Sequence, residues 1–75
     1  MKVIDELTAY GHRNIQGTHQ TTLEITKADQ VTLKGDCIIA VRASKATIDL
    51  DPSLKILLRK TGSKVKLTVE VNGLR

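Results

Sequence analysis

Two histidines in a polar stretch are the residues best suited to chemistry in this chain. His12 and His19 lie seven residues apart in the segment GHRNIQGTHQTTLEIT. On a regular strand an odd separation places two side chains on opposite faces, whereas a bulge at Gly17 would bring them to the same side. Imidazoles can act as general bases or bind a metal ion, and Glu24 or Asp36 would complete such a site. The alternative is a pair of loop histidines bonded to the backbone, since the spacing typical of zinc ligands does not occur.

Other polar side chains stand close to the histidines in sequence or follow the next apolar run. Glu24 lies on the polar face of an alternating segment, where exposure to solvent is the simpler interpretation. Cys37 follows Asp36 and begins an apolar run, and both features disfavour the reactive thiolate. Lys45 follows that run, a common position for binding residues, although an ordinary exposed lysine fits equally well. The sequence thus predicts a polar groove with these candidate ligand-binding residues: His12, Asn14, His19, Thr21, Glu24, Asp36 and Lys45.

Several well-known catalytic and cofactor-binding motifs are absent from the sequence. There is no glycine-rich phosphate loop and no Gly-x-Ser-x-Gly nucleophile motif. Tyr10 is the only aromatic residue, so the chain cannot stack several bases, and any contact with nucleic acid would use phosphates and shape. We therefore expect no cofactor and no resident metal ion, and the sequence leaves open whether the protein is an enzyme.

The net charge of +4 originates in the second half of the chain. Residues 38–75 carry eight Lys and Arg side chains against three acids, whereas residues 1–37 carry four against five. A basic patch can meet phosphates, although a solvated helix face beside a solvated strand face gives the same pattern. The candidate nucleic-acid contacts are Lys55, Arg59, Lys60, Lys64 and Lys66.

The size and composition of the chain suggest one small domain that needs a partner. Its 75 residues correspond to a single domain, residues 1–75, and a core of Ile, Leu, Val and Ala at this length is marginal. Cys37 is the only cysteine, which excludes a disulfide within the chain and favours a reducing, cytoplasmic setting. The sequence predicts no secretory signal and no membrane span, because no apolar run approaches about 20 residues. Self-association, most simply as a homodimer, would supply the missing core.

The first half of the chain has a strand-rich pattern. Residues 20–26 alternate between polar and apolar side chains, which predicts a half-buried strand. Residues 37–43 are nearly all apolar and predict a central strand buried on both faces. Residues 3–9 fit either a helix or a strand. Residues 44–50 fit one helical turn capped by Ser44.

The clearest element is a helix over about residues 52–61. Asp51 is a favourable N-cap, Pro52 suits the first helical position, and Gly62 is a typical stop. Residues 64–71 then alternate cleanly and predict a strand whose apolar side chains, Val65, Leu67, Val69 and Val71, point inward. The fold class that follows is α+β, with a mostly antiparallel sheet and one main helix.

Asn72-Gly73 after this strand is a strong hairpin signal, because a two-residue turn of this kind needs positive φ at both positions. Only Leu74 and Arg75 follow, so the expected second strand would come from another chain. The alternative is a frayed C-terminus in which this turn never closes.

The polar stretch and the run KGDCIIAVRASKA together resemble a family of small archaeal proteins of unknown function, over residues 11–50. The resemblance implies that members are longer and that their second half echoes the first. This chain would then be the N-terminal half, and a site built from both halves would be completed by a second chain. The family pattern falls on His12, Asn14, Thr18, His19, Thr21, Thr22, Glu24, Thr26, Gly35, Asp36, Cys37 and Lys45.

Three functions remain open from the sequence. The first is a homodimeric binding or assembly module whose polar groove takes a small anion, a nucleotide or a nucleic-acid backbone. The second is a metal-assisted, endonuclease-like phosphodiester hydrolase that uses the two histidines with Glu24 and Asp36. The third is a nucleic-acid-binding protein that contacts phosphates through the basic second half.

Overall fold

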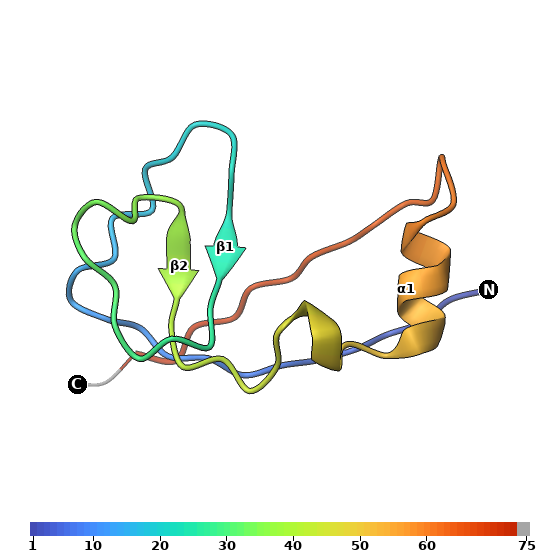
Figure 1. The fold of residues 1–75 in the computed structure, drawn as a ribbon, viewed down its shortest axis with the longest axis horizontal. Coiled ribbons are helices and arrows are strands. Elements are labelled where there is room, and N and C mark those ends of the chain that lie inside the picture. The colour runs from blue at the N-terminus through green and yellow to red at the C-terminus, as the bar shows by residue number, and fades with distance from the viewer. Residues whose placement is uncertain (74–75) are drawn as a thin grey trace.

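The computed structural model describes residues 1–73 and shows a small α+β fold, as predicted (Figure 1). Two short strands and a helix are joined by long irregular segments. In chain order the elements are strand β1 (Glu24–Ile25), strand β2 (Ile38–Ala40), the 3₁₀ helix η1 (Thr47–Asp49) and helix α1 (Pro52–Leu58).

The two strands pair in parallel, so the prediction of a mostly antiparallel sheet is wrong. Glu24 pairs with Ile38 and Ile25 with Ala40, with an irregular register between them. The segment 26–37 returns along the sheet before β2 begins, and therefore both strands point the same way (Figure 1). A turn closed by the hydrogen bond from Gly35 N–H to the Thr32 carbonyl oxygen, at 3.0 Å, completes this return.

Close packing inside this returning loop explains why residue 35 is a glycine. A Cβ atom on Gly35 would lie 3.0 Å from Val31 Cγ2 and 3.2 Å from Ile38 Cδ1. Val31 is buried, so its side chain cannot move away into solvent. Any larger residue at position 35 would overpack the small core.

Both strands are shorter than the segments 20–26 and 37–43 that were predicted for them. The chain after β2 is interrupted by Arg42, which adopts φ 54°, an uncommon conformation for a residue with a side chain. Its guanidinium group lies 4.4 Å from the centre of the Tyr10 ring, a favourable cation–π geometry. Tyr10 and Val41 exchange two backbone hydrogen bonds of 2.8 Å, the one antiparallel bridge within residues 1–73.

Helix α1 begins where the sequence predicts and ends three residues early. Asp51 Oδ1 accepts from the backbone N–H of Ser53 at 2.8 Å, which confirms the N-cap. The chain leaves the helix after Leu58 through a tight turn to Gly62, which has φ 89°. Positive φ at this glycine directs the chain away from the helix axis.

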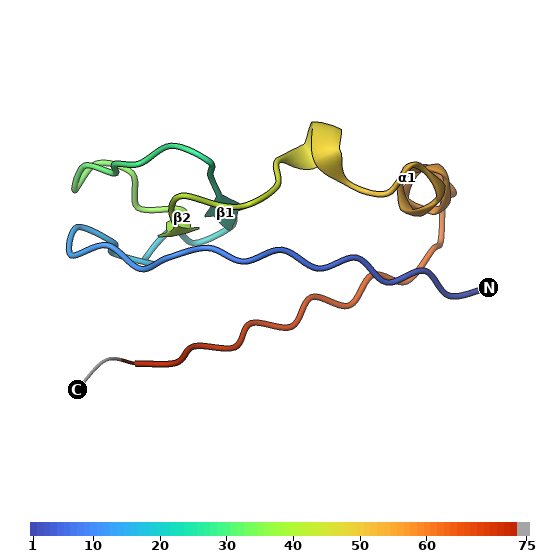
Figure 2. The same cartoon turned by 90° about the horizontal axis from the view of Figure 1, so that it is seen from below.

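The segment before α1 forms η1, but Ser44 does not cap it. The cap position is Ala46, whose N–H donates to Asp49 Oδ2 at 2.9 Å. Ser44 instead joins the N-terminal segment, where its hydroxyl accepts from the N–H of Thr8 at 3.0 Å. Residues 1–9 are extended, which settles the choice between helix and strand left open by the sequence (Figure 2).

Residues 64–73 form a long extended segment, here called the arm, that runs from the turn after α1 back toward the end of the molecule that holds the sheet (Figures 1 and 2). Within residues 1–73 the arm makes no backbone hydrogen bond to any other segment. Its alternating apolar side chains were predicted to point inward, but Leu67 is 62% exposed and Val71 84% exposed. The segment is therefore extended, as a strand would be, but within residues 1–73 it pairs with no other strand.

The predicted hairpin turn does not form at Asn72-Gly73. Neither residue has the positive φ that a two-residue turn requires. Leu74 and Arg75, which would begin the second strand, lie outside the described residues.

The molecule exposes more surface and is more extended than a compact domain of its mass. A compact chain of 8.2 kDa exposes about 4,500 Å², whereas this chain exposes 6741 Å². Its radius of gyration is 13.8 Å, against about 11 Å for a compact domain of 75 residues. Among residues 1–73 the buried apolar side chains are Val31, Val41 and Ala43, of which Val41 is fully buried.

Candidate functional site

The loop around His19 has the most defined polar geometry among the predicted site residues. The Nδ1 atom of His19 accepts from the backbone N–H of Thr21 at 3.2 Å and from that of Thr22 at 3.0 Å. Because Nδ1 serves as an acceptor, the ring proton of the neutral imidazole is on Nε2. No partner for this Nε2–H is found within residues 1–73, and the ring is exposed. The loop thus presents an unused N–H donor to solvent.

Backbone bonds hold this loop against the turn that precedes β2. The N–H groups of Thr18 and His19 both donate to the carbonyl oxygen of Asp36, at 3.1 and 3.2 Å. Gly17, with φ 61°, makes the bend that allows this approach. Asp36 therefore contributes its backbone to the site. On the same loop as His19, the hydroxyl groups of Thr21 and Thr22 lie 3.3 Å apart.

His12 has a structural role instead. Its Nδ1 accepts from the N–H of Asn14 at 3.1 Å, and its Nε2 lies 3.3 Å from Gln30 Oε1. The Asn14 amide donates to the carbonyl oxygen of Val31 at 3.0 Å, which ties the loop to a core residue. Within residues 1–73 each histidine ring bonds to its own neighbours and not to the other ring, so the pairing that the sequence allowed stays a prediction.

The acidic side chains do not gather around the histidines. Glu24 on β1 is approached by Cys37, whose Sγ lies 3.9 Å from its Oε1. In the part of the chain that the structure describes, no three His, Cys, Asp or Glu side chains lie close enough to hold a metal ion together.

Lys45 belongs to a different site from the histidines. Its ammonium group forms an ion pair with Asp5, whose other oxygen accepts from the backbone N–H of Asp51 at 2.7 Å. The hydrogen bond from Lys45, followed by that from Asp51, lowers the pKa of Asp5 to about 2. This carboxylate fastens the N-terminal segment to the start of α1. Sequence reasoning missed Asp5, because its partners lie 40 and 46 residues away.

The Asp5 carboxylate should make the fold sensitive to strong acid. Its folded pKa lies below the value of about 3.9 for an unfolded chain, so its contribution is complete above pH 4 and is lost as the pH falls toward 2. We expect Asp5→Asn to lower stability near neutral pH and to flatten the stability profile between pH 4 and 2. Urea unfolding across this range measures both effects.

Glu6 provides the matched control for that experiment. It is exposed and adjacent, and its side chain has no hydrogen-bond partner within residues 1–73. Glu6→Gln should leave the acid-dependent loss in place. An unchanged profile in Asp5→Asn would show that the ion pair does not couple to folding.

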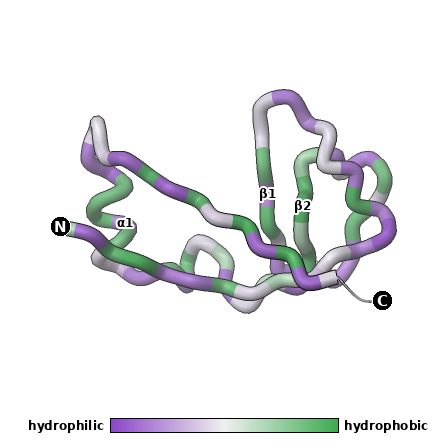
Figure 3. Tube along the Cα trace, turned by 180° about the vertical axis from the view of Figure 1, so that it is seen from behind, coloured by the Kyte–Doolittle hydropathy of each residue, from purple (hydrophilic) through white to green (hydrophobic). Residues whose placement is uncertain are grey.

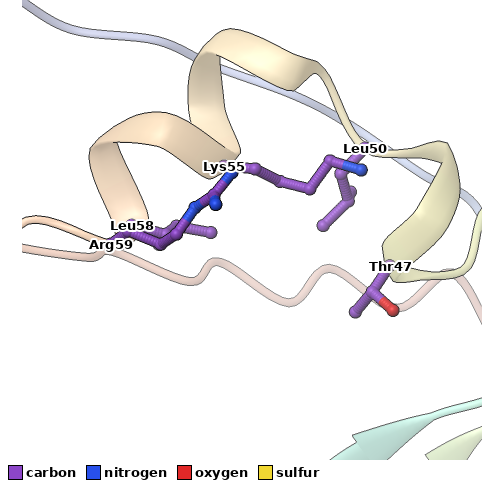
Figure 4. Close-up of a pocket in the computed structure, with 5 residues that line it drawn as sticks. All are labelled: Thr47, Leu50, Lys55, Leu58 and Arg59. Carbon is purple, nitrogen blue, oxygen red and sulfur yellow. The ribbon is translucent and has the colours of Figure 1, made fainter.

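The basic residues lie along the end of α1, the following turn and the arm. Lys55 donates to the carbonyl oxygen of Ile48 at 3.2 Å, and with Arg59 it borders a shallow hollow of about 310 Å³ (Figure 4). The hollow is also lined by Thr47, Leu50 and Leu58. Three further candidate nucleic-acid contacts are exposed beyond it, on the turn and the arm: Lys60, Lys64 and Lys66.

A much larger space separates the arm from the rest of the molecule. It has a volume of about 1940 Å³ and is lined by residues 1–11, by side chains of the sheet and α1, and by residues 63–73. Apolar residues alternate with polar ones along the arm that borders it (Figure 3). We call this space the gap. No motif marks it in the sequence, although the alternation of the arm together with the shortage of core residues indicated a missing partner.

One negative finding concerns membranes. No helix within residues 1–73 combines the length and the hydropathy that crossing a bilayer requires.

Comparison with known proteins identifies the family. Residues 7–75 match the domain of unknown function DUF371. Over 69 residues the chain is 42% identical to an uncharacterised protein of the archaeon Methanocaldococcus jannaschii, which covers 92% of this chain and 50% of the relative. The chain thus spans about half the length of this curated relative, and members longer than this chain were expected from the resemblance. No solved structure matches. The chain belongs to the DUF371 family, as the resemblance to archaeal proteins of unknown function predicted.

Proposed function

We propose that this protein is a binding and assembly module that acts as a homodimer, in which a second copy completes the fold. The observation that carries the proposal is the arm. Ten consecutive residues with unpaired backbone groups and an exposed apolar row border a gap of about 1940 Å³. Backbone N–H and C=O groups in folded proteins are normally hydrogen-bonded. An exposed strand edge of this length can therefore pair with a strand of another chain.

The exposed area supports the same conclusion. The chain exposes on the order of 2,000 Å² more than a compact chain of its mass. Obligate homodimers bury about 1,000 Å² or more on each partner, and their interfaces resemble a core cut in two. The surplus is therefore large enough for an obligate interface, and the arm and the gap supply its apolar lining.

The polar loop supports a binding role within this assembly. The Nε2–H of His19 offers a donor on one exposed loop, and of the mutually bonded Thr21 and Thr22 hydroxyl groups one keeps its proton free to donate. Such donors suit the oxygens of a small anion, and the proposed ligand is a phosphate group, either free, in a nucleotide or in a nucleic-acid backbone. His12 and Asn14 bond to Gln30 and Val31, which fixes the residues that precede the loop. Lys45 is left out because it is paired with Asp5.

No observation favours the metal-assisted hydrolase over this proposal. Its suggested ligands are His12, His19, Glu24 and Asp36. Among the described residues, no three His, Cys, Asp or Glu side chains lie close enough together to hold a metal ion.

The oligomeric state in solution tests the proposal. Light scattering of the purified chain at micromolar concentration should give twice the chain mass of 8.2 kDa.

A further inference from the structure

The arm and the N-terminal segment border the gap from opposite sides and run in the same direction (Figures 1 and 2). Residues 1–9 are held on one side only, by contacts such as Ser44 N–H to the Thr8 carbonyl oxygen at 2.8 Å. The arm has no backbone bonds to the rest of the described chain. A strand that ran in the opposite direction could therefore pair with both segments at once.

The arm is complementary to itself in the antiparallel direction. When two copies pair with Thr68 opposite Thr68, every apolar residue of the arm meets an apolar residue and each lysine in the middle meets an acid. The direct pairs are Thr68 with Thr68, Leu67 with Val69, Lys66 with Glu70, and Val65 with Val71.

We propose that two copies exchange their arms, so that each arm enters the gap of the other copy in this register. This inference rests on the proposed homodimer and adds the segment that forms it. A twofold axis through Thr68 then gives a four-stranded antiparallel sheet, with the order N-terminal segment, arm of the second copy, arm, N-terminal segment of the second copy. The exchange covers the row of exposed side chains, namely Val65, Leu67, Val69 and Val71.

A neighbouring register fits less well. With Leu67 opposite Leu67, the side chains still alternate correctly, but Val71 faces Ser63 and Lys66 faces Thr68. Val71 then loses its apolar partner, whereas Glu70 only exchanges Lys66 for Lys64, so the number of Lys–Glu pairs is unchanged. The register centred on Thr68 is favoured because all four apolar residues of the arm then face apolar residues.

Disulfide trapping tests the register. In a Cys37→Ser background, Thr68→Cys places two thiols directly opposite each other, at a distance that a disulfide can span. Leu67→Cys is the matched control, because its two copies would be offset by about 7 Å along the strands. We expect a covalent dimer for Thr68→Cys under mild oxidation and none for Leu67→Cys. The reverse result would establish the neighbouring register and overturn the inference.

Charge reversal gives a second test that needs no disulfide. Lys66→Glu and Glu70→Lys each place like charges opposite each other twice, and each should weaken its own dimer about tenfold. A mixture of the two variants should recover dimers, because each lysine then faces a glutamate. If the mixture dissociates as readily as each variant alone, the arm exchange is contradicted.

The outcomes separate this inference from the proposed function. A native dimer by mass without Thr68→Cys trapping and without recovery in the mixture would refute the arm exchange and leave the homodimer standing. A monomeric mass at all concentrations would refute both, and would assign the gap to a different polypeptide.

Discussion

Leu67→Asp is expected to convert the dimer into a monomer. Leu67 is 62% exposed in the single chain and borders the gap, so a partner would bury two copies of it. Loss of two buried leucines costs about 4 kcal/mol in total. This corresponds to about a thousandfold increase in the dissociation constant, before the cost of burying two carboxylates is added. Light scattering across a dilution series measures the change.

Ile48→Asp is the matched control for this substitution. Ile48 is also apolar and exposed, at 82%, but it lies on η1 and does not line the gap. It should leave the dimer intact. If both variants dissociate equally, or if neither does, the arm is not the interface. Circular dichroism of each variant separates a folded monomer from an unfolded chain.

His19→Ala is expected to abolish most of the phosphate binding. The substitution removes the outward Nε2–H donor and the acceptor that orders the N–H groups of Thr21 and Thr22. One hydrogen bond to a charged ligand is worth about 1.5–3 kcal/mol, so affinity should fall at least tenfold. Nuclear magnetic resonance titration with inorganic phosphate follows the amide signals of this loop directly.

His12→Ala is the control that distinguishes loss of the His19 donor from a general loosening of the loop. His12 already uses both ring nitrogens within the fold and offers no outward donor. Its loss should reduce affinity much less than that of His19. Shifts centred on Lys60 and Lys64 in the native protein would instead place the anion on the basic turn and overturn the His19 site.

Local signals in the sequence were sufficient to predict some parts of the fold. The start of α1 follows from Asp51 and Pro52, whose preferences depend on the adjacent backbone alone. The alternation of residues 64–71 predicted an extended segment, which the arm confirms.

Other features depended on distant contacts that a single sequence does not display. The direction of β2 relative to β1 is decided by the path of residues 26–37, and no local pattern in this segment predicts that it returns along the sheet before β2 begins. The pairing of Lys45 with Asp5 joins positions 40 residues apart. The burial of the arm was predicted from its pattern, but burial requires a partner, and the isolated chain leaves Val71 exposed.

The mass of the protein in solution tests the central claim most directly. At micromolar concentration and neutral pH, light scattering coupled to size exclusion should report two chains, twice 8.2 kDa, and the species should dissociate only as it unfolds. A stable, folded monomer of 8.2 kDa at these concentrations would contradict the account, because the arm would then remain unpaired in a folded protein.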